Sequence, residues 1–374
     1  IHPLQNPHSR FGFDMRQNWL EEVEIPPSGS LDEFDRKRMR NDYALMALIE
    51  TGVRRVRIPA TDLLVPEHRA RLADCACLGF QFTLFSFGLP DKRLLDAVAN
   101  AKGLIDIWEI CHTTEALPDV VEMSRATVKA ANVSIYLSRI RTREDQESAG
   151  GKYHHMIVHG FTPNDDKQIK ETASLADVDG LVFRVEGSVS PWEAARSAHA
   201  ACSSHGLEAS LHVRMTKGPP GLKQTDDDWV ANRVAEAVAA ACAFENLHVY
   251  ADTFADVDRG YYRRHGVVDR FYNPRPGFEV ARQLTAAFAQ FRSFSPGNEG
   301  SQVSLTGEAG QRFELIRESS MEASDTYAVS GRLIDLYTGD CIPATRSDNG
   351  TFQPPTQSPL SLWETREEPN QTVK

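Results

Sequence analysis

Hydrophobic and polar residues alternate in short runs along the first 290 or so positions, and longer amphipathic stretches separate these runs. Eight runs have the alternation typical of β-strands, at 52–59, 80–87, 104–110, 132–140, 154–161, 180–187, 208–215 and 247–252. Helical periodicity fills most of the gaps, in stretches such as 66–79, 116–132, 165–177, 190–206 and 226–246. Strand and helix alternating at intervals of about 25 residues predict a parallel α/β fold, and the number of units favours a (β/α)8 TIM barrel.

A ninth candidate strand, RFGFDM at 10–15, exceeds the eight strands of a closed barrel. The polar segment RTREDQESAGGKY separates the runs at 132–140 and 154–161 and is too short for a regular helix. We therefore interpret these two runs as one strand with a hairpin-like extension, and the run at 10–15 becomes strand one. This numbering places strands four, seven and eight at 104–110, 208–215 and 247–252.

The pattern changes after about residue 292. Short alternating runs, RFELIRE, DTYAVSGRLIDLY and PLSLWE, lie among Gly, Pro, Asn and Asp. Short alternating runs separated by turn-forming residues predict a small antiparallel β domain, similar to a β-sandwich, beside the barrel. The expected domains are a TIM barrel at 1–292 and a β domain at 293–374, whose last residues, REEPNQTVK, are expected to fray.

Composition narrows the classes of function. The 374 residues are 41% hydrophobic and 25% charged, values typical of a globular protein. The formal net charge of −11 argues against a general affinity for nucleic acid or for an anionic membrane, so neither partner is expected. No apolar run approaches the ~20 residues of a membrane span, and the first residues, IHPLQNPHSR, do not resemble a signal peptide.

Cysteine usage bears on the compartment. Six cysteines, at positions 75, 77, 111, 202, 242 and 341, show neither the paired spacing of zinc ligands nor the density of a disulfide scaffold. This favours a reducing environment, and we expect a cytoplasmic location. Because the chain begins at Ile1 and not at a methionine, the sequence leaves open a missing leader or a missing preceding domain.

Arginines gather at the carboxyl ends of the predicted strands, where barrel enzymes place their chemistry. The four that end different strands are Arg57, Arg139, Arg184 and Arg214. In an acidic chain such a set predicts an anionic ligand, because a guanidinium matches a carboxylate, sulfonate or phosphate with two parallel hydrogen bonds. The alternative is that each arginine pairs with a neighbouring carboxylate as part of the barrel structure. Phosphate is less favoured, since GPPGLKQT lacks the residue order of a Walker loop.

Carboxylates end several of the same strands. They are Asp14, Glu109, Glu186 and Asp252. Glu109 shares a strand face with Ile105 and Ile107, so it ends strand four on the side of the two isoleucines. A carboxylate there suits general acid or base catalysis, and a second one beside it would suit glycosidic cleavage. The alternative is a structural ion pair with an arginine such as Arg139.

Histidines near the strand ends raise the alternative of a metal site. His155 and His159 share a face, and Glu109 with His112 could join them at the top of the barrel. No HExxH or comparable ligand spacing occurs, so we expect no metal and no other cofactor. His212, near the end of strand seven, is expected to act as a base or as a hydrogen-bond donor.

The stretch YADTFADVDRGYYRRHGVVDRFYNPRPGFEVARQL, residues 250–284, carries a family resemblance. It contains His265-Gly266-Val267-Val268-Asp269 and then Asn273-Pro274-Arg275-Pro276. These phrases resemble the end of a retaining glycoside hydrolase barrel of the large (β/α)8 clan, in which strand eight leads to a Gly-Leu-Val-Asp-like phrase and to a Pro-Arg-Pro that opens the last helix. The β domain ending in PLSLWE is similar to the accessory β-sandwich of many such hydrolases.

The resemblance implies catalytic glutamates that the sequence does not provide. The clan places its acid/base in an Asn-Glu pair at the end of strand four, where this chain has His112-Thr113 after EIC. It places its nucleophilic Glu at the end of strand seven, where this chain reads SLHVRM. No catalytic residue can therefore be carried over from the family.

By elimination, we predict Glu109 and Glu186 as the working carboxylates and His212 as a catalytic base or donor. The predicted substrate-binding residues are Asp14, Arg57, His112, Arg139, Arg184, Arg214 and Asp252. The function that follows is a carbohydrate-active enzyme, a glycoside hydrolase-like protein or a lyase, whose partner is a small anionic sugar or glycoside. The alternatives are a metal-dependent isomerase, aldolase or lyase on a small sugar acid, and a catalytically inactive glycan-binding barrel.

Overall fold

The structure of the chain is a computed structural model. It describes residues 6–15, 19–25, 37–148, 157–217, 226–258, 263–297, 302–317, 329–347, 352–353 and 358–366. Three features discussed above lie outside these residues: His155, the segment GPPGLKQT at 218–225, and the end of the chain at 367–374, which was expected to fray. The positions and contacts given below belong to the described residues.

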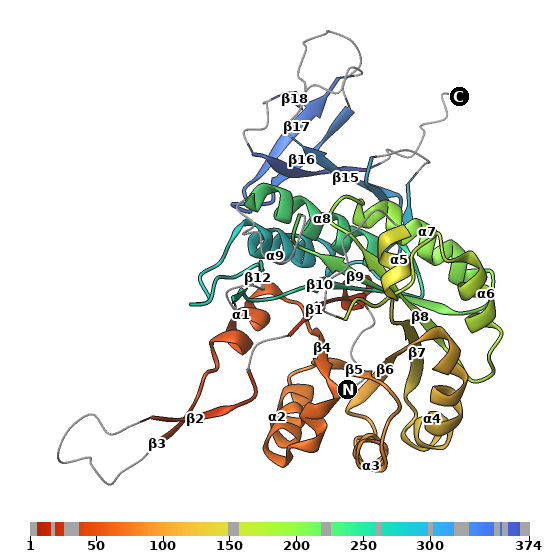
Figure 1. Cartoon of the computed structure of the whole chain (residues 1–374). Helices are drawn as coiled ribbons and strands as arrows, with labels where there is room; N and C mark the ends of the chain where they lie inside the picture. Colours follow the sequence, from red (N-terminus) through yellow and green to blue (C-terminus); the bar gives the residue numbers. More distant parts are fainter. Residues whose placement is uncertain are drawn as a thin grey trace, which may run out of the picture.

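A closed barrel of parallel strands forms the main body (Figure 1). Within the described residues its eight strands are, in chain order, β1 (Phe11–Asp14), β4 (Arg55–Pro59), β5 (Gln81–Phe87), β6 (Ile105–His112), β7 (Ser134–Arg139), β8 (Gly180–Val185), β9 (Glu208–Arg214) and β10 (Leu247–Asp252). β1 closes the barrel by pairing with both β4 and β10. The predicted TIM barrel is confirmed, and β6, β9 and β10 are its fourth, seventh and eighth strands.

The run predicted at 154–161 adds no further barrel strand in the described part of the chain. Residues 154–156 lie outside that part. After them, His159 forms an antiparallel bridge with Ile140, and Phe161 forms a parallel bridge with Phe183 of β8. The chain after β7 therefore turns back along the end of that strand, as the hairpin-like extension predicted.

Helices surround the barrel (Figure 1). They are α1 (Tyr43–Thr51), α2 (Pro66–Cys77), α3 (Lys92–Ala99), α4 (Leu117–Ala131), α5 (Arg143–Ser148), α6 (Asp166–Ala173), α7 (Pro191–Ser203), α8 (Asp227–Ala243) and α9 (Pro276–Phe288), with short 3-10 turns at Pro7–Arg10, Ala60–Leu64 and Thr114–Ala116. Asp91, Ser190 and Asp226 each accept a hydrogen bond from a backbone N–H three residues on, which caps α3, α7 and α8.

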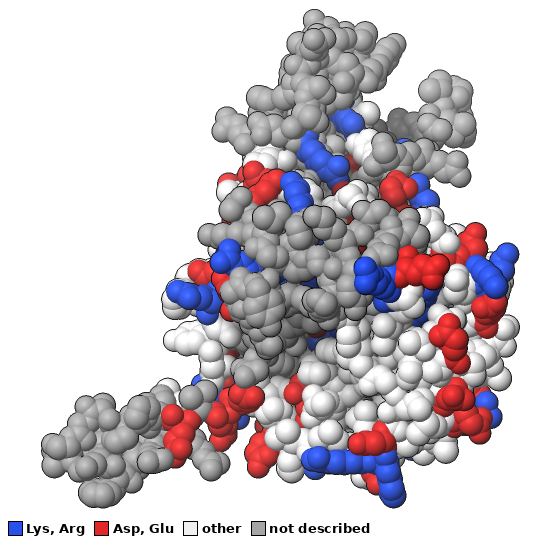
Figure 2. All heavy atoms as spheres, in the orientation of Figure 1, with Lys and Arg blue, Asp and Glu red and all other residues white. Residues whose placement is uncertain are grey.

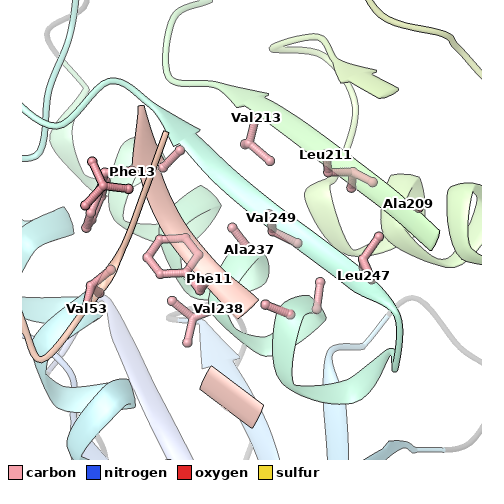
Figure 3. Close-up of a cluster of buried hydrophobic side chains, with 14 of the residues drawn as sticks. Phe11, Phe13, Val53, Ala209, Leu211, Val213, Ala237, Val238, Leu247 and Val249 are labelled. Carbon is pink, nitrogen blue, oxygen red and sulfur yellow. The ribbon is translucent and has the colours of Figure 1, made fainter. Parts of the chain in front are cut away.

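The apolar core lies between the strands and the helices. Figure 3 shows Phe11 and Phe13 of β1 and Val249 of β10 beside Ala237 and Val238 of α8. All five side chains are buried. The small alanine side chains of α8 allow the helix to approach the barrel closely, so the outward faces of these strands exclude water.

The C-terminal residues form an antiparallel sheet. In the described part it has seven strands, in the spatial order β13 (Phe294–Pro296), β14 (Ser304–Gly307), β15 (Gln311–Arg317), β19 (Leu360–Arg366), β16 (Val329–Asp335), β17 (Cys341–Arg346) and β18 (Phe352–Gln353). Phe313 of β15 and Phe294 of β13 contact Phe288 of α9 edge to face, with ring centroids 5.5 and 5.0 Å from it. The predicted C-terminal β structure is therefore present and packs against the barrel.

Two small hairpins complete the described structure. β2 (Glu22–Ile25) pairs with β3 (Lys37–Arg40), and this hairpin projects away from the barrel in Figure 1. β11 (Val257–Asp258) pairs with β12 (Arg263–Arg264) in the loop after β10. Figure 2 shows basic and acidic side chains interspersed on the visible face. Among the described residues, no helix is both long enough and apolar enough to cross a bilayer.

Candidate active site

Polar side chains occupy much of the barrel interior, where branched aliphatic residues are the usual filling, and they lie beside a small buried apolar cluster of Ile107, Tyr136 and Val182. Arg55 donates to Asp106 over 2.7 Å and to the Gln81 side chain over 2.8 Å. The hydroxyls of Thr83 and Tyr250 are 2.5 Å apart. Buried polar groups remain stable only when they are hydrogen-bonded, so this network holds each inward side chain in a defined position.

Glu109 of β6 is the centre of the upper part of this network. Its side chain is fully buried and accepts hydrogen bonds from Arg57 Nε over 2.5 Å and from Ser210 Oγ over 2.6 Å. His212 Nε2 of β9 lies 3.0 Å from the same carboxylate. Arg57 also donates to Asp14 of β1 over 3.0 Å. Residues from four barrel strands are thereby joined into one cluster.

The charges of this cluster fix the protonation of Glu109 and His212. Burial alone would raise the pKa of Glu109, but Arg57, His212 and Ser210 hold it well below the usual range of a carboxyl group. Glu109 is therefore ionised and can only accept hydrogen bonds. The pKa of His212 is lowered, first by burial and then by Arg57, in spite of the attraction of Glu109.

The state of Glu109 decides the tautomer of His212. Since the carboxylate can only accept, the ring proton of neutral His212 lies on Nε2 and points to Glu109. The described residues supply no hydrogen bond to the other ring nitrogen, Nδ1. His212 thus presents a lone pair on the side away from Glu109, as a general base requires.

A second cluster lies directly above, where β8 and β9 end. Glu186, the residue after β8, accepts hydrogen bonds from Arg184 Nε and from Arg214, the latter over 3.1 Å. Burial would raise the pKa of Glu186, but Arg184 and Arg214 lower it. The Nε atom of Arg214 is buried and has no hydrogen-bond partner among the described residues. A buried donor without a partner is costly, so this N–H is a candidate contact for a ligand.

Arg233 of α8 supports this second cluster from behind. Its guanidinium donates to backbone carbonyls of Glu186, Gly187 and Val189 after β8, and to the carbonyl of Arg214 at the end of β9. One side chain therefore ties together the backbone segments that carry Glu186 and Arg214. The distances, 2.7 to 3.3 Å, are those of ordinary hydrogen bonds.

The structure separates the predicted site residues into groups. Asp14, Arg57, Glu109 and His212 form the lower cluster, and Arg184, Glu186 and Arg214 form the upper one. Asp252 of β10 is the register partner of Arg214 and forms an ion pair with Arg264 of β12.

Arg139 and His112 have different surroundings. Arg139 binds Asp145 over 2.5 Å and Asp165 over 2.7 Å, next to Arg141, which also binds Asp165. His112 Nδ1 accepts a hydrogen bond from the backbone N–H of Thr113 over 2.8 Å. Arg139 is thus engaged in an ion-pair network of its own, beside the loop that follows β7.

Besides Arg233, two more residues of the site, Ser210 and His159, were absent from the predicted set of site residues. Ser210 could have been found, because it lies two positions before His212 and so faces the barrel interior with it. His159 was considered only as a metal ligand. It lies beside His212, on a segment after β7 that forms isolated bridges and no barrel strand in the described part of the chain, so the alternation in 154–161 did not reveal its position. Among the described residues, no group of three or more His, Cys, Asp or Glu side chains is arranged to hold a metal ion.

Comparisons with known proteins agree with the fold. No protein-family model and no curated sequence matches the chain. A solved family 39 glycoside hydrolase from the gut symbiont Bacteroides cellulosilyticus WH2 is similar, with a TM-score of 0.59 at 14% identity over 97% of this chain and 81% of that one. A 4-O-α-L-rhamnosyl-β-D-glucuronidase from Fusarium oxysporum 12S, solved with Rha-GlcA, has a TM-score of 0.53 at 8% identity over 96% of both chains. The chain therefore has the fold of these glycoside hydrolases.

Proposed function

We propose that the chain is a carbohydrate-active enzyme that acts on an anionic sugar, and that its reaction is a β-elimination at a uronate. The observation that carries this proposal is the buried pair of Glu109 and His212. The ionised carboxylate orients the imidazole and stabilises the imidazolium that forms when His212 takes a proton, while Nδ1 remains available as the base.

The upper cluster supplies the other requirement of the reaction. A proton next to a carboxylate is acidic enough to remove only when the negative charge that develops on the carboxylate is stabilised. Arg184 and Arg214 lie at the ends of neighbouring strands, and the unpartnered N–H of Arg214 suits a carboxylate oxygen. Removal of that proton by His212 then forms a C=C bond as the bond to the neighbouring glycosidic oxygen breaks. The departing oxygen takes a proton from solvent, and His212 returns its proton to solvent.

Hydrolysis of a uronide is a second candidate, favoured by the similarity to a solved glucuronidase. It requires a carboxylic acid that protonates the leaving group and a second carboxylate that acts as nucleophile or base. Glu109 is poorly suited to either role, because it is fully buried and its pKa is lowered by Arg57 and His212 against the effect of burial. Glu186 is the more accessible carboxylate, with a side chain 44% exposed.

The experiment is a substrate screen that distinguishes the two reactions. Oligouronides and aryl glucuronides are incubated with the protein, together with their neutral counterparts. Elimination produces ultraviolet absorbance from a C=C bond conjugated to the carboxylate. Hydrolysis produces new reducing ends without a new ultraviolet absorbance. His212→Gln removes the base, and His205→Gln, at an exposed position of the surface, is the matched control.

The expected result is ultraviolet absorbance with uronides, absent in His212→Gln and unchanged in His205→Gln. New reducing ends without ultraviolet absorbance would refute elimination and would support hydrolysis. Saturable binding of oligouronides without either product would identify a glycan-binding barrel and would refute the proposed enzyme.

A further inference from the structure

His159 lies beside His212 at the mouth of the barrel. The two rings meet edge to face, with centroids 5.5 Å apart and an interplanar angle of 79°. Gly160 has a φ of +104°, and a Cβ there would lie 2.9 Å from Cβ of Arg184. The backbone next to His159 thus has a conformation, and a closeness to β8, that favour glycine.

The neighbours of His159 determine where its ring proton lies. Nδ1 is 2.9 Å from the hydroxyl of Ser138 and 3.5 Å from the thiol of Cys111. Burial raises the pKa of Cys111 to about 12, so this thiol keeps its hydrogen. Two groups that can donate hydrogen therefore face Nδ1, which favours Nδ1 as the acceptor and places the ring proton on Nε2.

The charge of His159 follows from the groups around it. Its pKa is well below the ordinary value, because the ring is buried and because His212 on β9 and Arg57 on β4 would repel a second positive charge. Arg184 on β8 acts in the same direction, and Glu109 on β6 opposes it. At neutral pH His159 is a neutral imidazole, and the described residues supply no hydrogen bond to its Nε2.

The two histidines therefore present opposite groups. His212 directs its N–H towards Glu109 and leaves a lone pair open, whereas His159 has its acceptor nitrogen engaged and leaves an N–H open. A neutral imidazole with a lowered pKa can stabilise a developing oxyanion by donating a hydrogen bond without itself being charged. A base and a neutral donor thus lie side by side.

We propose that His159 is a second catalytic residue, and that its Nε2–H donates a hydrogen bond to the glycosidic oxygen that gains negative charge as His212 removes the proton. This role rests on the elimination proposed above. The N–H is not transferred to the substrate, so the proton balance stays as given: one proton passes from carbon to His212, and the departing oxygen is protonated by solvent.

The test uses substitutions that separate donation from basicity. A glutamine side chain keeps a neutral N–H donor and a leucine side chain does not. On a uronide that the wild type cleaves, His159→Leu should lower kcat by roughly 100-fold, a typical contribution of one positioned donor, and His159→Gln should restore most of that loss. His212→Gln should show no turnover, because a glutamine side chain cannot accept the proton. Equal losses in His159→Leu and His159→Gln would overturn the proposal.

A second measurement does not depend on turnover. Nitrogen-15 NMR of labelled histidine distinguishes the two tautomers and reports titration. We expect His159 to be neutral with its proton on Nε2 at pH 7 and still uncharged at pH 6, and we expect Ser138→Ala to populate the Nδ1–H tautomer. A wild-type ring protonated at Nδ1 would overturn the assignment of His159 whether or not a substrate has been found. A correct tautomer together with no turnover of any uronide would instead refute the proposed function.

Discussion

Replacing Glu109 by glutamine tests whether the lower cluster depends on a buried charge. The substitution keeps the shape of the side chain but removes the negative charge that faces Arg57 and His212. It also places an amide N–H opposite a group that is itself a donor. Breaking a fully buried ion pair costs about 3–5 kcal/mol, because the remaining charge loses its compensation.

The expected change in thermal stability follows from the size of the chain. With an unfolding entropy of about 2.1 cal/mol/K per residue, 374 residues give about 0.8 kcal/mol/K, so the midpoint should fall by about 4–6 °C. The matched control is Glu186→Gln, since the Glu186 side chain is 44% exposed and also faces two arginines. The carboxylate of this cluster is in contact with solvent, which weakens its pairing, so the midpoint of Glu186→Gln should fall by less than that of Glu109→Gln.

The pH dependence gives a second readout of the same substitution. The pKa of Glu109 is lowered in the folded state, so its contribution to stability is present above the unfolded value of about 4.3 and is lost as the pH falls further. The gap in thermal midpoint between wild type and Glu109→Gln should therefore narrow from about pH 5 to pH 3. Circular dichroism melts at several pH values measure it. Equal midpoints for the two glutamine variants, or a gap independent of pH, would refute the reasoning.

Three further outcomes are expected. Arg214→Ala should raise KM for an anionic substrate by roughly 10- to 100-fold, the loss of one charged hydrogen bond, and should leave KM for a neutral analogue unchanged; equal effects in steady-state kinetics would indicate a structural role. The pKa of His212 is lowered, chiefly by burial, so kcat/KM for elimination should be constant at neutral pH and should fall only when the pH is lowered below about 6.5. A fall in kcat/KM that begins at a pH higher than this as the solution is acidified would contradict His212 as the base. The exposed thiols of Cys77 and Cys341 should react with a thiol reagent in the folded protein and the four buried thiols only after denaturation, which a spectrophotometric titration checks.

The sequence was sufficient to predict the barrel because each strand and helix carries its own periodicity. The alternation in RFGFDM and the polar segment after 132–140 gave the correct strand numbering, so Glu109 and His212 could be placed on the fourth and seventh strands before the structure was known. Positions on a regular strand have a direction that follows from parity alone. This is why the direction of side chains on regular strands, such as Glu109 and His212, could be anticipated.

The partner of each side chain could not be predicted in the same way. Arg57 and Arg139 both end strands, but Arg57 enters the barrel interior and Arg139 binds carboxylates after β7. Successive residues of a strand point to opposite faces, so a shift of one residue decides whether an arginine enters the barrel interior. The partners of Arg139 depend further on where the chain after β7 places Asp145 and Asp165. Likewise, the return of the chain after β7 was predicted, but its placing of His159 beside His212 was not, because that contact depends on packing between residues far apart in the sequence.

Helix α8 has a consequence for how this protein can be divided or recombined. Arg233 and Glu236 lie one turn apart on the same side of this helix. Arg233 holds the strand ends of the upper cluster, and Glu236 accepts hydrogen bonds from Ser190 and Trp192 at the start of α7 and pairs with Arg317 of the C-terminal sheet. Arg317 of the sheet thus neutralises the Glu236 carboxylate, which lies one helical turn from Arg233. Excising the sheet as an independent module would remove Arg317, the partner that this carboxylate has in the sheet. During evolution, an exchange of this sheet for another module would therefore require accompanying substitutions on α8, and the two parts are expected to have diverged as one inherited unit.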